Sequence, residues 1–350
     1  MTVDEASEGL ALVTGGGGLL GRAVVLRLRE GGAAVRVLSR RPLPDLEAAG
    51  VEVVHGDLED RDSVIAACRG VRRVVHAGAK PGIDAPLSTF LGPNVAGTRH
   101  VVDGCLVARV RTLVHISSPS VVFDGSPHDG ENESLPTPDR GMASYPHSKL
   151  LAERDALRAD RIRGLRVVAL RPHLIWGPGD RHVLPTLVEA LKGGRAPAIS
   201  GANPLIAPTY VGNAAAAALH VLDELPRRPA LAGRAYFLND LPAVRLRDFV
   251  QRVAGEAGLP APRWRALPAS LATAAGKAAT GLWRATGRTS EPPLSPFTVA
   301  QLSVPHWYRM DGLRQFGAWE TVEPEAAWRA TRPYLQALTK GDEIPPAEAA

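Results

Sequence analysis

Short apolar runs alternate with segments of helical periodicity along the first half of the chain. Six runs consist almost wholly of hydrophobic residues, which is typical of strands buried on both faces of a parallel sheet: 10–14, 34–38, 51–54, 73–77, 112–117 and 165–170. Segments between them repeat apolar residues at the spacing of a helix: 22–30, 63–68, 93–109 and 143–163. This alternation predicts an α/β fold, a Rossmann-type doubly wound parallel sheet with helices on both faces.

The second half of the chain loses this alternation. Gly and Pro interrupt it repeatedly, and helices are predicted at 183–191, 213–223, 246–257 and 324–338. We therefore expect a smaller C-terminal substrate-binding domain that is interleaved with the sheet domain. The predicted boundaries are 1–178 for the Rossmann domain, with a returning segment near 205–240, then 179–204 and 241–340 for the substrate-binding region and 341–350 for a flexible tail.

The composition is that of an ordinary globular protein. Hydrophobic residues make up 45% and charged residues 22% of the 350 residues, which excludes a disordered chain, a coiled coil and a collagen-like chain. Two cysteines, Cys68 and Cys105, are too few for a disulfide framework or a four-ligand zinc site. We expect both to be reduced thiols packed in helices of a cytoplasmic protein.

Signals for targeting and for macromolecular partners are weak. Asp4, Glu5 and Glu8 precede the first apolar run, which argues against a signal peptide, and no stretch reaches the roughly 18 apolar residues of a membrane-spanning helix. The net charge of +5 is spread along the chain without a dense Lys/Arg block, so we expect no nucleic-acid partner. The ten histidines lack ligand spacing, so we expect no metal site.

Glycines at a regular spacing follow the first predicted strand directly. Gly15, Gly18 and Gly21 form G-x-x-G-x-x-G between that strand and the first predicted helix. Glycine there permits a tight turn, a close approach of the backbone to a pyrophosphate, and close packing of the helix on the strand. The free N–H groups and the positive dipole at the helix N-terminus then favour the phosphates. The sequence therefore predicts a dinucleotide site at this loop.

The end of the second predicted strand bears on which dinucleotide binds. Ser39, Arg40 and Arg41 stand where a site for NAD usually has Asp or Glu for the ribose hydroxyls. A hydroxyl and two guanidiniums can instead donate hydrogen bonds to a 2′-phosphate, so NADP(H) is favoured and NAD(H) stays the alternative. Asp57, after the third strand, can accept a hydrogen bond from the adenine amino group; its other interpretation is a helix N-cap.

Tyr145 and Lys149 form Y-x-x-x-K on a predicted helix. Four residues are about one turn, so both side chains project from one face, and a cation beside a phenol lowers the pKa of the phenol. The alternative is an ordinary surface pair on a helix. Ser118 lies at the end of a predicted strand, where ligands bind in open α/β sheets. Its neighbour Ser117 is expected to point to the opposite side.

These residues resemble the fingerprint of the extended short-chain dehydrogenase/reductase superfamily. The resemblance also rests on Asn94-Val95-x-Gly97-Thr98, Arg171-Pro172 and Thr209-Tyr210-Val211-x-Asn213, and it covers nearly the whole chain. Within the superfamily, the sequence is similar to the 3β-hydroxysteroid dehydrogenase branch. The segments 171–180 and 305–310 resemble bacterial 2-alkyl-3-oxoalkanoate reductases, the reductases of long-chain olefin and β-lactone biosynthesis.

The resemblance implies a role for each matching residue. Tyr145 would be the general acid in ketone reduction, Lys149 would bind the nicotinamide ribose and tune Tyr145, and Ser118 would hydrogen-bond the substrate oxygen. Pro172 would lie against the nicotinamide. The complete set of expected cofactor contacts is Gly15, Gly18, Leu19, Leu20, Gly21, Ser39, Arg40, Arg41, Asp57, Leu58, Ala77, Gly78, Ala79, Asn94, Tyr145, Lys149 and Pro172.

The activity that the resemblance implies is NADPH-dependent reduction of the 3-keto group of a long-chain 2-alkyl-3-oxoalkanoic acid. Leu174 replaces an Asn that nucleotide-sugar epimerases and dehydratases commonly use to bind the sugar nucleotide, so an acyl chain or a sterol suits this position better. A 3β-hydroxysteroid dehydrogenase or isomerase is the alternative. A nucleotide-sugar epimerase and a non-enzymatic NADP-sensing protein are less favoured, the latter because the Tyr-Lys pair is retained.

Two features of the second half concern the lipid-like substrate. An apolar wall is expected from Leu174, Ile175, Trp176 and Trp307, and the candidates for binding a carboxylate are His173, Arg181 and His182. The segment 267–283 is apolar and alanine-rich, so a core helix of the substrate domain is preferred over an interfacial helix in peripheral contact with a membrane. A homodimer is left open.

Overall fold

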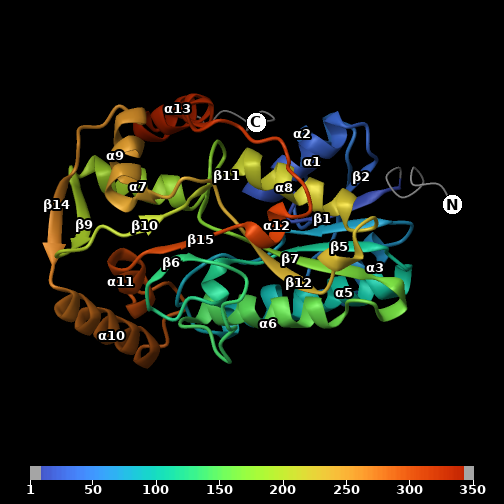
Figure 1. Ribbon diagram of the computed structural model, residues 1–350, viewed down its shortest axis with the longest axis horizontal. Coiled ribbons are helices and arrows are strands. Elements are labelled where there is room, and N and C mark those ends of the chain that lie inside the picture. Colours follow the sequence, from blue (N-terminus) through green and yellow to red (C-terminus); the bar gives the residue numbers. More distant parts are fainter. Residues whose placement is uncertain (1–8, 343–350) are drawn as a thin grey trace.

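The computed structural model describes residues 9–342 and has a seven-stranded parallel sheet at its centre (Figure 1). The strands of this sheet are β1 (Ala11–Thr14), β2 (Val35–Ser39), β3 (Glu52–His55), β4 (Arg73–His76), β5 (Thr112–Ile116), β7 (Arg166–Pro172) and β12 (Arg234–Leu238). They lie in the order β12-β7-β5-β4-β1-β2-β3, which confirms the predicted Rossmann-type sheet. Asp4, Glu5 and Glu8, and the predicted tail from residue 343 on, lie outside the described residues.

Helices cover both faces of this sheet (Figure 1). The helices α1 (Leu19–Glu30) and α8 (Val211–Glu224) pack against each other over one face, and α3 (Arg61–Ala67), α5 (Gly97–Ala108) and α6 (Ser144–Arg158) cover the other. The strands are buried between these layers, which explains their continuous apolar sequences. Cys105 in α5 and Cys68, directly after α3, are buried free thiols, as predicted.

Two predicted helices differ from the structure in their ends. The helix predicted at 93–109 is α5 preceded by a π-helical turn, Leu91–Ala96, and by α4 (Ser88–Phe90). Pro93 has no N–H to continue an α-helical ladder, so the turn widens there. The helix α6 ends at residue 158 and not at 163, because Arg161 and Arg163 have φ values of 67° and 50°, outside the helical region.

The C-terminal region is built from short strand pairs and a group of helices (Figure 1). The strand pairs are β8 (Ile175–Trp176) with β11 (Thr209–Tyr210), β9 (Arg195–Ile199) with β14 (Arg263–Leu267), β10 (Leu205–Ile206) with β13 (Val244–Arg245), and β6 (His128–Glu131) with β15 (His306–Tyr308). The helices are α7 (Val183–Lys192), α9 (Leu246–Glu256), α10 (Ala269–Ala285), α11 (Pro296–Ser303), α12 (Asp311–Arg314) and α13 (Pro324–Lys340). The strand β12 returns to the sheet beside β7, although the domain boundaries themselves stay a prediction.

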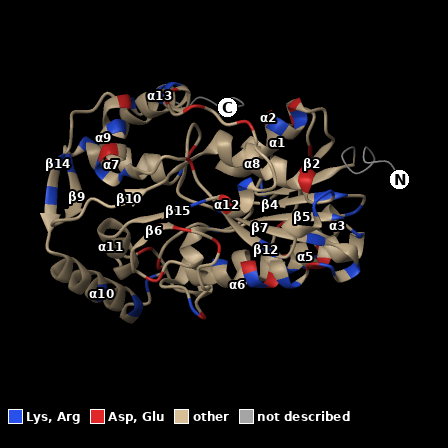
Figure 2. Cartoon of the chain, in the orientation of Figure 1, with Lys and Arg blue, Asp and Glu red and all other residues tan. Residues whose placement is uncertain are grey.

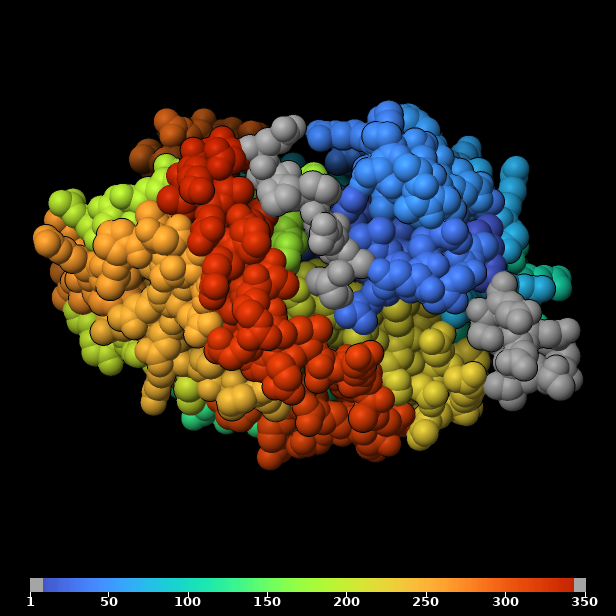
Figure 3. Space-filling model, turned by 90° about the horizontal axis from the view of Figure 1, so that it is seen from above, coloured from blue at the N-terminus to red at the C-terminus, as the bar shows by residue number. Residues whose placement is uncertain are grey.

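A second hydrophobic core lies among α7, α9 and α13. Trp176, Phe249 and Trp328 pack there, with ring centroids 4.1 to 5.8 Å apart. The helix α13 contacts both α7 and α9. Figure 3 shows this C-terminal segment in red, lying between the orange residues of the C-terminal region and the blue residues of the N-terminal half. The segment that contains α13 therefore lies on the side of the molecule where the two halves meet.

The helix α10 lies on the surface at the edge of the molecule (Figure 1). Its buried residues are the small Ala272, Gly276 and Thr280, while Leu271 and Leu282 are 61% and 57% exposed. The preferred interpretation of 267–283 as a core helix is therefore wrong, because small residues at every fourth position form the packing face. Within residues 9–342, no helix has both the length and the apolar character needed to cross a membrane.

Candidate active site

The glycine loop lies where the strand order of the sheet reverses, between β1 and β4. Gly15, directly after β1, has a φ of 73°, and a Cβ atom on it would lie 2.6 Å from the backbone nitrogen of Gly78, after β4. A Cβ atom on Gly21 would overlap the carbonyl oxygen of Gly15. Both positions therefore require glycine. The crevice at such a reversal is where open α/β sheets bind ligands.

The helix α1 begins immediately after this loop. Gly18 is its N-cap, Leu19 and Leu20 are its first residues, and no side chain caps its N-terminus. The first N–H groups of the helix therefore keep their capacity to donate to a ligand, and no acidic residue in the first turn opposes an anion. These features fit the pyrophosphate of a dinucleotide.

A chain of buried hydrogen bonds fixes the segment after β4. Thr98 Oγ1 donates to the carbonyl oxygen of Asn94 (2.6 Å) and bonds His76 Nε2 (2.9 Å), while His76 Nδ1 bonds the hydroxyl of Thr14 (2.7 Å). Thr14 Oγ1 also accepts from the Gly78 N–H (3.2 Å). Burial lowers the pKa of His76 to about 3. The ring is thus neutral, with Nε2 as donor and Nδ1 as acceptor, as this chain of bonds requires.

Asn94 ties the same segment to α6. Its Oδ1 accepts from the Lys80 N–H (2.7 Å), and its Nδ2 donates to Ser148 Oγ (2.9 Å), which in turn donates to the carbonyl oxygen of Tyr145 (2.8 Å). Asn94 is only 1% exposed. In this structure it positions other groups, and its direct contact with a cofactor stays a prediction.

Three further residues predicted to bind the cofactor surround Gly78. Ala77 and Ala79 flank it in the chain and are half-buried. Leu58 lies against it, because a Cβ atom on Gly78 would stand 2.8 Å from Leu58 Cδ1. Small and apolar groups therefore surround the segment that faces the glycine loop.

The end of β2 carries the residues predicted to distinguish NADP(H) from NAD(H). The side chain of Arg40 is 71% exposed, with Nη1 3.8 Å from Asp57 Oδ2, and Arg41 is also exposed. Ser39 Oγ donates to the carbonyl oxygen of Arg41 (2.7 Å), so its proton holds the turn and is not free for a phosphate. The N-cap of α3 is Asp60, so the alternative interpretation of Asp57 as that N-cap is wrong.

Tyr145 and Lys149 lie one turn apart on α6. The Lys149 side chain is buried, and its Nζ donates to the carbonyl oxygen of Ile116 at the end of β5 (2.6 Å). Ser118 follows two residues later and caps the 3₁₀ turn Pro119–Val121, which packs against α6. The structure therefore brings Ser118 and the Tyr-Lys pair to the same end of β5.

The hydroxyl group of Ser118 has its own proton available. Its Oγ accepts from the N–H (3.2 Å) and from the hydroxyl (2.9 Å) of Ser120. Both bonds use its lone pairs, so Ser118 can donate to a substrate oxygen. The neighbouring Ser117 is 5% exposed, and its hydroxyl has no hydrogen-bond partner among the described residues.

Burial controls the pKa values of the Tyr-Lys pair. It raises the pKa of Tyr145 to about 12 and lowers the pKa of Lys149 to about 8, an effect that the carboxylate of Glu153 opposes. The expected lowering of the Tyr145 pKa is therefore wrong for this structure, because burial disfavours the phenolate and the ammonium is held at Ile116. At pH 7, Tyr145 is a protonated acid and Lys149 is a cation.

A buried ion pair joins α6 to β7. Arg171 Nε and Nη2 donate to the two carboxylate oxygens of Glu153 at 2.9 and 2.6 Å, and the two residues are 4% and 2% exposed. Pro172, the expected nicotinamide contact, is the next residue and ends β7. The sequence pattern leaves this pair unpredicted, although Glu153 lies four residues after Lys149 and so shares its helix face, a signal that could have revealed it.

The start of α6 is held by residues from a distant part of the chain. The Ser144 N–H donates to Asp84 Oδ1 (3.2 Å), and the Tyr145 N–H donates to the carbonyl oxygen of Ile83 (3.0 Å). The N–H groups of Ile83 and Asp84 donate in turn to the carboxylate of Glu291 at 2.8 and 2.7 Å. No local pattern reveals these contacts, because 208 positions separate Ile83 from Glu291.

The residues predicted to form an apolar wall do not assemble as one surface. Trp176 is buried in the core of the C-terminal region, Ile175 packs against both large cores, and Leu174 is 36% exposed with a φ of 29°. Trp307 donates from Nε1 to Asp129 Oδ1 (2.5 Å). Because successive residues of a strand point to opposite sides, Ile175 and Trp176 cannot face one ligand together.

The three candidates for binding a carboxylate differ in their surroundings. His173 is 5% exposed, and burial lowers its pKa well below the usual value, so it carries no charge at pH 7 and is excluded as a cation. Arg181 and His182 are exposed at the start of α7, where His182 is the N-cap residue. Their contact with a substrate stays a prediction.

Apolar side chains adjoin Tyr145 at the start of α6. The ring of Phe90 meets the ring of Tyr145 edge-on, with centroids 5.8 Å apart. Ile83, whose carbonyl oxygen accepts from Tyr145, and Met142, three residues before it, are each 37% exposed. An apolar ligand that reaches Tyr145 can therefore contact exposed apolar residues on the segments that hold the start of α6.

Known proteins are similar to this chain over most of its length. The model of the 3-beta hydroxysteroid dehydrogenase/isomerase family matches residues 12–269. A 2-alkyl-3-oxoalkanoate reductase of Stenotrophomonas maltophilia is 35% identical over 321 residues, which cover 91% of this chain and 97% of that protein. One of Shewanella oneidensis is 34% identical over 312 residues, covering 87% and 80%. The structure of MoeE5 in complex with UDP-glucose and NAD, 23% identical, shares the fold with a TM-score of 0.69 over 93% of this chain and 98% of that chain.

Proposed function

The chain belongs to the 3-beta hydroxysteroid dehydrogenase/isomerase family and is an NAD(P)-dependent oxidoreductase, and from this premise we propose the reaction that it catalyses. It reduces, with NADPH, the 3-keto group of a long-chain 2-alkyl-3-oxoalkanoic acid to the 3-hydroxy acid. Relatives named for this reaction support the substrate class. The observation that carries the proposal is the placement of Ser118 and of the Tyr145-Lys149 pair of α6 at the end of β5.

Tyr145 acts as the general acid. Its raised pKa, about 12, keeps the phenol protonated at neutral pH, and the phenol gives this proton to the carbonyl oxygen as negative charge develops there. Ser118 donates its free hydroxyl proton in a hydrogen bond to the same oxygen and so stabilises the developing oxyanion. Lys149, one helical turn from Tyr145, binds the nicotinamide ribose with its ammonium group. In the reverse direction, the phenolate accepts the proton of the hydroxy acid.

The residues at the ends of β1, β2 and β7 bind the dinucleotide. The glycine loop and the N-terminus of α1 hold the pyrophosphate, and Pro172 is the proposed neighbour of the nicotinamide. When bound, the dinucleotide supplies the hydride that reduces the carbonyl carbon. The exposed guanidiniums of Arg40 and Arg41 support NADP(H) over NAD(H), because only the 2′-phosphate can use both charges.

The test of the reaction is a side-by-side assay with NADPH. Long-chain 2-alkyl-3-oxoalkanoic acids are compared with 2-methyl-3-oxobutanoic acid, the matched short-chain control, and with 3-ketosteroids. Each buried methylene contributes about 0.8 kcal/mol, so kcat/KM should rise with chain length until the acyl chain fills its binding site. Turnover of the steroids without turnover of the branched oxoacids would replace this function by that of a 3β-hydroxysteroid dehydrogenase.

A peripheral contact with an anionic membrane belongs to the same proposal. The segment from 257 to 290 has five Lys and Arg residues and no Asp or Glu, and Figure 2 shows no red on α10. Leu267, Leu271 and Leu282 on this segment are more than half exposed. Cationic surfaces with exposed leucines bind anionic lipid, and vesicles with and without phosphatidylglycerol measure this binding. The cytoplasmic location and the homodimer stay predictions.

A further inference from the structure

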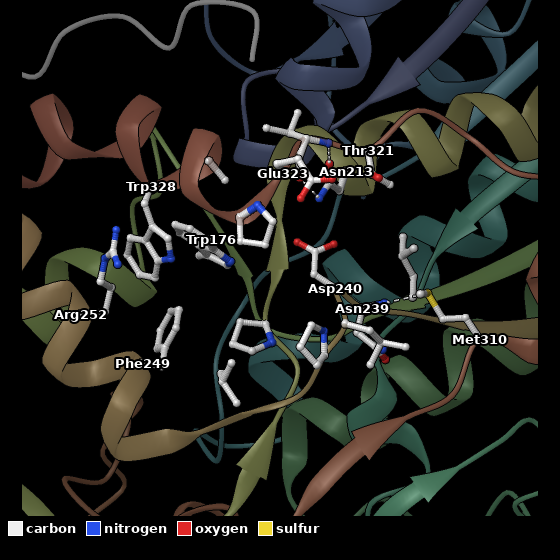
Figure 4. Close-up of a pocket in the computed structure, with 18 of the residues that line it drawn as sticks. Trp176, Asn213, Asn239, Asp240, Phe249, Arg252, Met310, Thr321, Glu323 and Trp328 are labelled. Carbon is white, nitrogen blue, oxygen red and sulfur yellow. Dashed lines mark hydrogen bonds between the residues drawn. The ribbon is translucent and has the colours of Figure 1, made fainter.

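A cavity of about 490 Å³ lies in the C-terminal region, where β12 ends (Figure 4). Trp176, Phe249 and Trp328 line one side of it, and Asn239 and Met310 line the other. The glycine loop, Ser118, Tyr145 and Lys149 do not line it. Its volume is within the range of about 300 to 1,000 Å³ that is usual for small-molecule sites.

The aromatic side of the cavity is rigidly packed. The rings of Trp176 and Trp328 are 4.1 Å apart, and the ring of Phe249 lies 5.8 and 5.5 Å from them. The guanidinium of Arg252 stacks on Trp328 at 5.6 Å, but it is already paired with Glu256 and Glu325, each at 2.7 Å. The faces of aromatic rings carry partial negative charge, so this side attracts apolar groups and cations.

Asp240 projects into the cavity from the segment after β12 (Figure 4). Its Oδ2 accepts from the Tyr210 N–H (2.7 Å), and no salt bridge engages it among the residues that the structure describes. Burial raises the pKa of Asp240 to about 6, and the groups that oppose this rise, the Tyr210 N–H and the Asn213 side chain, are uncharged. At neutral pH the cavity therefore contains an ionised carboxylate that forms no salt bridge with a described residue.

A buried amide beside Asp240 has one unsatisfied atom. Asn239 is 1% exposed, and its Nδ2 donates to the carbonyl oxygen of Tyr308 (2.8 Å). Its Oδ1 has no hydrogen-bond partner among the described residues, which is unusual for a buried amide oxygen. Glu323 adds an exposed carboxylate above Asp240 (Figure 4). With the exposed Asp248, three carboxylates in the lining thus offer acceptors to a ligand that brings donors.

We propose that this cavity binds an organic cation, an ammonium group attached to an apolar or aromatic body. The ammonium donates to Asp240, and the exposed carboxylates of Asp248 and Glu323 add electrostatic attraction. The body lies against Phe249 and Trp328. A cationic ligand is favoured over an anionic one. Arg314 lines the cavity but is exposed, so solvent screens its charge, whereas the carboxylate of Asp240 is partly buried and has no salt bridge with a described residue. The proposal does not depend on the reaction proposed above.

Binding can be followed by the fluorescence of the protein itself, since Trp176, Trp319 and Trp328, three of the six tryptophans, line the cavity. The full chain is titrated at pH 7.5 with 4-phenylbutylamine, with 4-phenylbutanol and with 4-phenylbutanoate. These probes share one body and differ in charge. We expect saturable binding of the amine to one site per chain, at least tenfold tighter than that of the alcohol, and still weaker binding of the carboxylate. Equal affinities, preference for the carboxylate, or no saturable binding of the amine would overturn the proposal.

Substitutions locate the binding. Asp240→Asn should weaken binding of the amine at least tenfold and leave the affinity for the alcohol unchanged. The control is Glu320→Gln, at an exposed carboxylate outside the lining, which should change neither affinity. Tyr145→Phe should also leave the affinity for the amine unchanged, which separates this site from the candidate active site. If Asp240→Asn does not fold, Glu323→Gln is used instead, because Glu323 is exposed. This variant should weaken binding of the amine about threefold. Full affinity in the folded Asp240 variant, or in the Glu323 variant where that one is used, would refute the site.

Discussion

Around the candidate active site, buried polar side chains bind one another: His76 bonds Thr14 and Thr98, and Arg171 pairs with Glu153. In the C-terminal region, ion pairs such as that of Arg252 with Glu325 lie at the surface, α10 exposes leucines to solvent, and Asp240 faces a cavity without a salt bridge in the described structure. The sheet domain therefore holds its reactive groups in one geometry, whereas the C-terminal region leaves groups available to ligands and surfaces.

This difference has a physical basis. A buried polar group costs free energy unless it is paired, so the groups beneath the crevice are satisfied within the protein and become rigid. An exposed pair adds little to stability and can rearrange at little cost. We infer that the chemistry is set by the sheet domain and that ligand selection is set by the C-terminal region.

Removing the proton donor should have the largest effect. Tyr145→Phe keeps the ring against Phe90 but deletes the acid, so kcat should fall by about 10²- to 10⁴-fold, the usual contribution of general acid catalysis. NADPH binding, measured by calorimetry, should be retained. Tyr236→Phe, which removes a buried hydroxyl on β12, is the control and should keep nearly full activity. A Tyr145→Phe variant with near-normal turnover would contradict the assignment.

The two kinds of ion pair should differ in their contribution to stability. Glu153→Gln leaves the Arg171 charge buried without its partner and should lower the free energy of unfolding by about 3 to 5 kcal/mol. Glu325→Gln breaks a pair whose carboxylate is 65% exposed and should cost less than about 1 kcal/mol. Urea denaturation of both variants measures this contrast. Equal losses would remove the distinction between the two regions.

The choice of dinucleotide should respond to one guanidinium. Arg40→Ala should weaken NADPH binding by about 1.5 to 3 kcal/mol, the loss of a hydrogen bond between charged groups, and leave NADH unchanged. Arg61→Ala, an exposed arginine on α3, is the control and should alter neither affinity. Fluorescence titration gives the dissociation constants of NADPH and NADH for each variant. If the unmodified protein binds both dinucleotides equally, the preference for NADP(H) is wrong.

The pH profile of reduction should show the smallest effect. Burial lowers the pKa of Lys149 to about 8, so the ammonium is present below this pH and is lost as the pH rises through it. Tyr145, with a pKa of about 12, stays protonated over the same range, so kcat should fall above pH 8 through Lys149 alone. Glu153 raises the pKa of Lys149, and Glu153→Gln should therefore move the fall to lower pH. A profile that is flat to pH 10 would contradict this role.

The parallel sheet, the glycine loop and the spacing of Tyr145 and Lys149 follow from local patterns. Strand and helix periodicity, and the need for glycine at a tight turn, depend on only a few neighbouring residues, so they can be predicted from the sequence. The ends of two helices were predicted less accurately. The π-helical turn at Pro93 and the positive φ values at Arg161 and Arg163 depend on how the neighbouring segments pack.

The sequence by itself determined the fold class, the crevice between β1 and β4 and the residues that meet there, because these depend on periodicity and on the order of strands. Only the tertiary structure decided which groups share a surface. In the folded protein, Glu291 lies near the start of α6 and Trp176 packs in the second hydrophobic core. The leucines of α10 are exposed, and Asp240 faces a cavity. These outcomes depend on burial and on partners far away in the chain, and burial also determined that the pKa of Tyr145 is raised and not lowered.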